Sequence, residues 1–176
     1  MIAREGEQGM PIDLYWVAGN WPGKVAVASR PRGDDWLADD IANWKRAGVN
    51  VVLSLLTSEE ESSLGLRGEA DQVRASGLDY VAFPIPDLQV PTSSAKLSET
   101  LDKLGANLAK GENVLIHCRQ GIGRSGLVAA CLLISKGLSP GAAIEQVSAA
   151  RGLPVPETPK QREWIDRFAI VSASAR

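Results

Sequence analysis

The sequence His117-Cys118-Arg119-Gln120-Gly121-Ile122-Gly123-Arg124-Ser125-Gly126 lies between two apolar segments of the chain. Residues 114–116 before it have the pattern of a buried strand, and residues 127–134 after it have the pattern of a buried helix. Glycines allow the intervening loop to close tightly, and the free backbone N–H groups of such a loop and of a helix N-terminus attract anions. The stretch therefore predicts a phosphate-binding loop between a strand and a helix.

The two ends of this loop carry residues suited to phosphoryl chemistry. We expect Cys118 to be ionised and nucleophilic near neutral pH, because loop N–H groups and a helix dipole stabilise a thiolate. Arg124 offers a planar set of donors for two phosphoryl oxygens, and Ser125 can donate a hydrogen bond to the sulfur. The lysine and the Mg²⁺-binding hydroxyl of a P-loop NTPase are missing. The alternative interpretation is an inert buried cysteine in front of a helix cap.

The pattern His-Cys-x-x-Gly-x-x-Arg-Ser over residues 117–125 resembles the active-site signature of the cysteine-dependent protein tyrosine phosphatase superfamily, and every fixed position is present. The chain looks most like the small dual-specificity or kinase-associated branch. This resemblance implies that Cys118, Arg124 and Ser125 are catalytic. It also implies a phosphate-binding loop made of Arg119, Gln120, Gly121, Ile122, Gly123 and Arg124. Rhodanese-like sulfurtransferases also place a cysteine in an anion-binding loop, but they do not require the arginine.

Length and composition indicate one globular domain. The chain has 176 residues, of which 44% are hydrophobic, and this is enough for a single core. Residues 1–11 are polar and glycine-rich and predict a loose arm, so the phosphatase domain is expected to cover residues 12–172. The net charge of −2 argues against a nucleic-acid partner, since proteins that neutralise many phosphates are normally basic.

The cysteine and histidine content argues against a disulfide framework or a zinc site. The chain has two cysteines, no CxxC motif and one histidine, so we expect no metal and no cofactor. No signal-peptide pattern occurs at the N-terminus, and the apolar run at residues 127–134 is too short to span a bilayer. We therefore predict a cytoplasmic protein without membrane insertion. The oligomeric state is left open.

Strand-like and helix-like segments alternate along the chain. Residues 12–17 and 24–29 predict an edge hairpin, and the apolar run 49–56 predicts a strand buried on both faces of a parallel sheet. A helix capped by Asp34-Asp35 is expected before this strand, and a Ser58–Glu61 capping box after it, preferred here to a metal site. A helical segment to residue 75 and a strand at 78–83 follow. The pattern predicts a single α/β domain with a central, mostly parallel sheet and helices on both faces.

Asp87 is the candidate general acid. It follows the predicted strand 78–83 in the proline-rich segment 84–91, and it lies 31 residues before Cys118. Ligands of such sheets bind beyond the carboxyl ends of the strands, where both residues are expected. The resemblance implies that Asp87 protonates the leaving group. The alternative is a turn residue that bonds its own backbone.

Two further residues are candidates for supporting roles. The resemblance implies that Gln161 positions the hydrolytic water, but Thr158-x-x-Gln161 is also a complete capping box, and the sequence favours neither role. His117 is expected to order Cys118 through hydrogen bonds.

These residues together predict a phosphomonoester hydrolase that works through a cysteinyl-phosphate intermediate. The expected substrates are phosphoproteins that carry phosphotyrosine, with phosphoserine and phosphothreonine as a broader expectation. A phosphoinositide phosphatase is the alternative, although lysines are missing from residues 117–126. A catalytically silent phosphate-binding module is the remaining alternative, but binding alone needs neither a thiol nor an acid.

Overall fold

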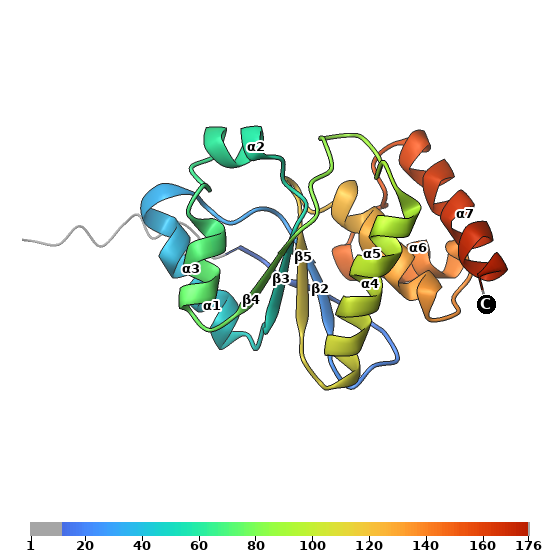
Figure 1. The fold of residues 1–176 in the computed structure, drawn as a ribbon, viewed down its shortest axis with the longest axis horizontal. Helices are drawn as coiled ribbons and strands as arrows, with labels where there is room; N and C mark the ends of the chain where they lie inside the picture. Colours follow the sequence, from blue (N-terminus) through green and yellow to red (C-terminus); the bar gives the residue numbers. More distant parts are fainter. Residues whose placement is uncertain (1–11, 176) are drawn as a thin grey trace, which may run out of the picture.

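The computed structural model describes residues 12–175, so the predicted arm at residues 1–11 lies outside the described residues. A five-stranded sheet with the order β1-β2-β5-β3-β4 runs through the centre of the molecule (Figure 1). Its strands are β1 (Tyr15–Val17), β2 (Val25–Ala28), β3 (Val51–Ser54), β4 (Asp79–Ala82) and β5 (Val114–His117). Strand β1 pairs antiparallel with β2, and the other neighbours are parallel. The predicted edge hairpin and mostly parallel sheet are confirmed.

Helices cover both faces of the sheet, as the sequence predicts (Figure 1). One face carries α1 (Leu37–Arg46) and α3 (Glu69–Ala75). The other face carries α4 (Ser94–Ala109), α5 (Arg124–Ser135), α6 (Pro140–Arg151) and α7 (Pro159–Ser174). The short α2 (Ser58–Ser63) and the 3₁₀ helix η1 (Asp34–Trp36) lie in the connections between these elements.

The sheet separates two apolar clusters, because successive residues of a strand point to opposite faces. In β5, Leu115 belongs to the cluster with Trp44 of α1, whereas Ile116 belongs to the cluster with α4, α5, α6 and α7. Strands β2, β3 and β5 are buried along their whole length, as expected for the inner strands of a sheet covered on both faces. Strand β5 therefore leads to Cys118 from the rigid centre of the molecule.

Helix α5 begins directly after the loop that follows β5. It is buried from Arg124 to Ile134 and contacts α4, α6, α7 and the sheet. A helix in this position must be apolar on all sides, which explains the uninterrupted run 127–134. Its packing fixes the backbone of Arg124 and Ser125.

The structure corrects two predicted helix starts. Asp34 and Asp35 do not cap a helix, because they lie within η1, whose N-cap is Gly33. Asp34 has a φ of 53° and donates from its N–H to Gly65 O, and the N-cap of α1 is Trp36, which makes no side-chain cap bond. The capping box predicted for Ser58 and Glu61 is formed one residue earlier, by Thr57 and Glu60, because Thr57 is the last residue with extended backbone.

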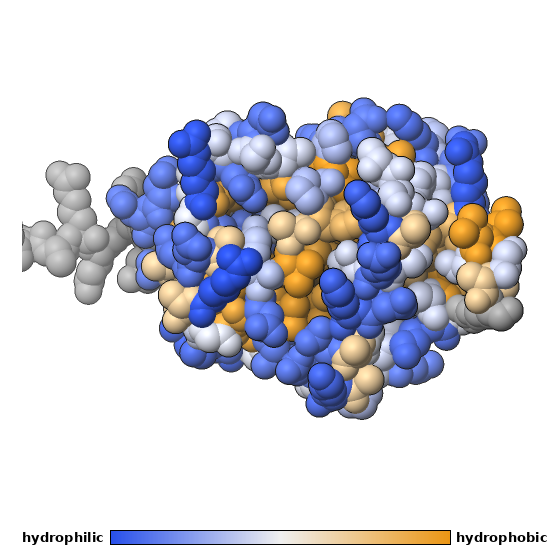
Figure 2. Space-filling model, viewed as in Figure 1, coloured by the Kyte–Doolittle hydropathy of each residue, from blue (hydrophilic) through white to orange (hydrophobic). Residues whose placement is uncertain are grey.

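The face shown in Figure 2 is mostly hydrophilic, with an apolar strip in its middle where Figure 1 places the edge strand β4. The helices thus cover the two faces of the sheet but leave this edge open. Within residues 12–175, no helix combines the length and the apolar character needed to cross a membrane.

Candidate active site

The loop between β5 and α5 holds the sulfur of Cys118 close to two donors. Gly121 N donates to Cys118 Sγ at 3.2 Å, and Ser125 Oγ lies 3.3 Å from the same sulfur. Gly121 has a φ of +72°, and a Cβ there would lie 2.6 Å from the carbonyl carbon of Ala28. Only glycine fits this close approach to the end of β2. The distance between Cys118 Sγ and Ser125 Oγ confirms the predicted contact between these two residues.

The carbonyl oxygens of the loop are bonded on its outer side. Arg151, at the end of α6, donates from Nε to Gly121 O at 3.0 Å and from Nη2 to Gln120 O at 3.3 Å. Arg30 N donates to Arg119 O at 3.2 Å. Carbonyls held outward leave the loop N–H groups free to face an anion. The sequence analysis did not single out Arg151, which lies far from the loop in the chain.

Arg124 is buried and bound to acidic and carbonyl groups. Its Nη1 and Nη2 donate to the two carboxylate oxygens of Glu60, at 2.8 Å each. Nη1 also donates to Ile85 O at 2.8 Å, and Nη2 donates to Asp87 Oδ1 at 3.1 Å. Every N–H group on the two Nη atoms therefore has an acceptor, and Nε–H is the remaining donor of the guanidinium group.

Charge and burial shift the pKa values of Glu60 and Arg124 in opposite directions. Burial would raise the pKa of Glu60, but hydrogen bonds from Arg124 and from Thr57 N outweigh it, and the pKa of Glu60 is lowered. Burial would likewise lower the pKa of Arg124, but its bonds with Glu60 and the nearby Cys118 and Asp87 raise it. Both groups therefore stay charged. The sequence analysis assigned the run 59–61 to a helix start and missed this role of Glu60.

The structure brings Asp87 to the site, where its side chain is 47% exposed. Oδ1 accepts from Arg124 Nη2 and also from Leu88 N, at 3.0 Å. Asp87 therefore accepts a hydrogen bond from the next residue of its own turn and also contacts Arg124.

A pocket of about 210 Å³ opens beside these residues. It is lined by Asp87, Leu88, Cys118, Gln120, Gly123, Arg124 and Glu157. Arg119, Gly121 and Ile122, predicted as part of the phosphate-binding loop, are not among its lining residues. Arg119 points to solvent, and Ile122 packs against the core. Glu157 was not predicted, because nothing in its local sequence indicates that the last loop returns to the site.

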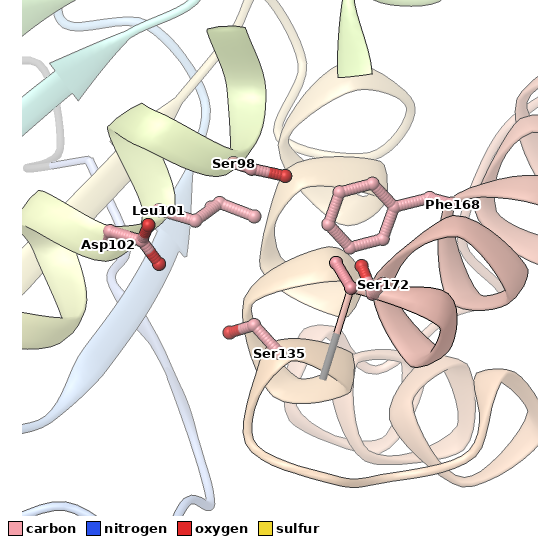
Figure 3. A pocket seen from close by; sticks show the side chains of 7 residues that line it. Ser98, Leu101, Asp102, Ser135, Phe168 and Ser172 are labelled. Carbon is pink, nitrogen blue, oxygen red and sulfur yellow. The ribbon is translucent and has the colours of Figure 1, made fainter. Parts of the chain in front are cut away.

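A larger hollow of about 260 Å³ lies away from this pocket, between α4, α5 and α7 (Figure 3). Ser98, Leu101, Ser135 and Phe168 are among its lining residues. Ser135 and Arg124 are at opposite ends of α5, which corresponds to roughly 16 Å along the helix. The larger hollow is therefore separate from the candidate active site.

Neither ring nitrogen of His117 has a hydrogen bond to Cys118, and the role of His117 in ordering Cys118 stays a prediction. Its Nε2 lies 2.5 Å from Glu69 Oε1, and its Nδ1 has no hydrogen-bond partner among the described residues. As the last residue of β5, the side chain points to the α1–α3 side, where Trp44 packs at 5.9 Å between ring centroids.

Gln161 forms the predicted capping box. Its Oε1 accepts from Thr158 N at 3.1 Å and from Glu157 N at 3.0 Å, and Thr158 Oγ1 accepts from Gln161 N. Its Nε2 donates to Gln89 O at 3.2 Å. The same amide lies next to the loop, because a Cβ on Gly123 would be 3.0 Å from it. The capping role is confirmed, and a role toward water stays a prediction.

The fold and the loop geometry define a cysteine-dependent protein tyrosine phosphatase, the superfamily that the sequence resembles. Residues 14–171 match the family model described as "Swiss Army Knife protein, DSP-PTPase phosphatase domain". The chain belongs to this family of phosphatase domains.

Individual relatives agree with this assignment. Cyclin-dependent kinase inhibitor 3 of Rattus norvegicus is 33% identical over 131 residues, which are 73% of this chain and 61% of the relative. Phosphatidylglycerophosphate phosphatase PTPMT2 of Arabidopsis thaliana is 28% identical over 134 residues, which are 74% of this chain and 55% of the relative. The chain thus spans less than two thirds of the length of either protein.

A solved structure matches almost the whole chain. It is a kinase associated phosphatase in which the catalytic-site cysteine is substituted by serine. Its TM-score is 0.84 at 25% identity, and the match covers 95% of this chain and 99% of that chain.

Proposed function

We propose that this protein is a phosphomonoester hydrolase that acts on phosphoproteins through a cysteinyl-phosphate intermediate. The observation that carries the proposal is the shared pocket of Cys118, Arg124 and Asp87, in which the sulfur already receives a hydrogen bond from Gly121 N. The proposed nucleophile, the anion-binding donors and the proposed acid thus line a single pocket.

In the first step, Cys118 Sγ attacks the phosphorus atom and the bond to the leaving oxygen breaks. Loop N–H groups and Arg124 hold the equatorial oxygens, and protonated Asp87 gives its proton to the leaving oxygen. A phosphoryl oxygen can use Arg124 Nε–H, and it can take Nη2–H by displacing Asp87. Substrate binding would thereby release Asp87 from Arg124 at the point where its proton is needed.

In the second step, water attacks phosphorus and the S–P bond breaks. Ionised Asp87 accepts the proton of the water, and the thiolate leaves with a hydrogen bond from Ser125 Oγ. The products are inorganic phosphate and the starting enzyme. We propose that Gln161 orients this water, and the position of its amide next to Gly123 supports this role.

Phosphoproteins are the proposed substrates because of the relatives. One relative is named as an inhibitor of a cyclin-dependent kinase, and the matching structure is of a kinase associated phosphatase. We propose phosphotyrosine as the main target and phosphoserine and phosphothreonine as further ones. We also place the protein in the cytoplasm, where thiols stay reduced, since Cys118 and Cys131 are both free.

A lipid phosphate is the second candidate substrate. It is favoured by the 28% identity to a phosphatidylglycerophosphate phosphatase. Of the loop side chains, exposed Arg119 is the one cation at the surface that could contact a phospholipid headgroup, because Arg124 is buried.

Release of phosphate from an aryl phosphate in the presence of EDTA tests the proposed reaction, with Cys118→Ser as the inactive control. Phosphotyrosine peptides, phosphothreonine peptides and phosphoinositide vesicles then separate the substrate classes. Tight binding of a phosphopeptide without phosphate release would contradict the enzyme and support a binding module. Release from vesicles alone would support the lipid candidate.

A further inference from the structure

The pair of His117 and Glu69 is buried behind the nucleophile and has no part in the two chemical steps. Both side chains are fully buried, with Nε2 and Oε1 2.5 Å apart. A buried carboxylate is costly unless it is paired, and a paired one still brings little net stability. Stability alone therefore does not explain why Glu69 lies here.

The pair connects three elements. Glu69 is the first residue of α3, and His117 is the last residue of β5, directly before Cys118. The His117 main chain is fixed as well, because its carbonyl accepts from Leu55 N at 3.0 Å. Trp44 of α1 packs on the imidazole. Both the main chain and the ring of His117 are therefore held, so the residue directly before Cys118 has a fixed orientation.

The other polar groups around the pair do not replace this bond. Burial and the charge of Glu69 raise the pKa of Glu61 on α2, which His117 opposes. Burial and the charge of Glu69 also raise the pKa of Tyr80 on β4, whose ring lies 5.5 Å from the Arg74 guanidinium carbon. Tyr80 Oη, Trp44 Nε1 and Glu69 Oε2 have no hydrogen-bond partner among the described residues. The bond from His117 Nε2 to Glu69 is thus the one that orients the imidazole ring.

We propose that Glu69 is a positioning residue for Cys118, acting through His117. This inference rests on the proposed use of Cys118 as the nucleophile. Glu69 accepts a hydrogen bond from Nε2–H of His117 and fixes the orientation of the ring. The fixed residue His117 in turn holds the start of the loop. The hydrogen bond thereby keeps Sγ within reach of Gly121 N and Ser125 Oγ, the two donors that stabilise the thiolate. Without it, the sulfur moves away from these donors.

Three variants test the inference: Glu69→Ala, Glu69→Gln and, as a control, Val73→Ala. Glutamine keeps an acceptor for Nε2–H, and alanine removes it. Val73 is a fully buried residue of the same helix, so its truncation weakens the packing of α3 but keeps the Glu69 side chain that bonds His117. Alkylation of Cys118 by iodoacetamide as a function of pH gives a readout that does not require phosphatase activity. Steady-state kinetics with an aryl phosphate give kcat and KM, and thermal unfolding identifies the temperature at which all variants are folded.

In Glu69→Ala, we expect the alkylation profile to move to higher pH and kcat to fall by about tenfold or more, with a smaller change in KM. Glu69→Gln should lie between Glu69→Ala and wild type, and Val73→Ala should keep the wild-type profile despite a lower melting temperature. If Glu69→Ala does not fold, the double variant Glu69→Gln/His117→Asn is compared with His117→Asn alone. The inference then requires that Glu69→Gln changes neither the alkylation profile nor kcat once His117 is replaced. A wild-type alkylation profile in folded Glu69→Ala would overturn the inference. Wild-type protein that alkylates readily but releases no phosphate would instead contradict the proposed function.

Discussion

Glu60 binds Arg124 through both of its carboxylate oxygens, at 2.8 Å each, on the inner side of the pocket. The two parallel bonds fix the plane of the guanidinium group. With Ile85 O on the same Nη1 atom, they leave Nε–H and the Nη2–H toward Asp87 for a phosphoryl group. Glu60 therefore decides which donors of Arg124 face the substrate.

Glu60→Gln should impair catalysis, because Glu60 orients Arg124. The amide keeps one acceptor but turns an NH₂ group toward Arg124, so the guanidinium group rotates. We expect kcat/KM to fall on the order of 10²-fold, as for other misplaced catalytic groups, and the protein to lose about 3 kcal/mol of unfolding free energy. Steady-state kinetics and urea unfolding measure both. Glu59→Gln, at the exposed neighbouring position, is the matched control and should change neither.

The same pair makes stability depend on pH. The pKa of Glu60 is lowered from 4.5 in the folded state, so its contribution to stability is complete above about pH 4.5. That contribution is lost as pH falls through the lower, folded-state value. In urea unfolding from pH 7 to pH 3, the unfolding free energy of wild type should therefore approach that of Glu60→Gln as the pH falls. A constant difference in unfolding free energy across this range would contradict the ion pair.

Asp87→Asn should slow the reaction according to the leaving group. Losing the proton donor should lower kcat by about 10² to 10⁴ with a phosphopeptide, whose leaving oxygen needs protonation. An aryl phosphate with a weakly basic leaving group should be affected least. Asp79→Asn is the control, because Asp79 pairs with Val51 at the start of the parallel strands, away from the site. Equal losses with all substrates would show that Asp87 only shapes the loop or holds Arg124.

The two cysteines should react at very different rates. Cys118 is the first residue of the loop and has donors on its sulfur, whereas burial raises the pKa of the Cys131 thiol in α5. Iodoacetamide should therefore inactivate the protein through Cys118, and phosphate or vanadate should protect it by occupying the loop. Peptide mass mapping should find the label on Cys118. Labelling of Cys131 first would contradict the prediction.

The parts of the site that could be predicted from the sequence are those that depend on neighbours in the chain. Cys118, Gly121 and Ser125 interact across a few residues, so their pattern is visible in the sequence. Glu60 could have been found only by combining the capping box with the adjacency of β3 and β5, which brings both carboxyl ends to one edge.

Glu69 and Arg151 had no such local signal. Each is a charged residue near a helix end, where exposed positions are the rule. Glu69 is buried because α3 packs on the sheet beneath Trp44, and Arg151 reaches the loop because α6 packs beside α5. These contacts depend on tertiary packing, which residue spacing does not encode.

Gln161 now has one established role and one predicted role, and a second residue of the same cap separates them. Thr158 and Gln161 each contribute a side-chain bond to the start of α7. Thr158→Ala and Gln161→Ala should therefore both cost about 1 kcal/mol of unfolding free energy.

Only Gln161→Ala should also slow the second chemical step, because the Gln161 amide is the one that lies against Gly123. In rapid-quench experiments with an aryl phosphate, this variant should show a burst of phenol release followed by slow turnover, as cysteinyl phosphate accumulates. Thr158→Ala loses a comparable part of the cap and should show no larger burst than wild type. If both variants accumulate the intermediate, the effect follows the cap and not the Gln161 amide. If neither variant accumulates it, Gln161 does not position the water.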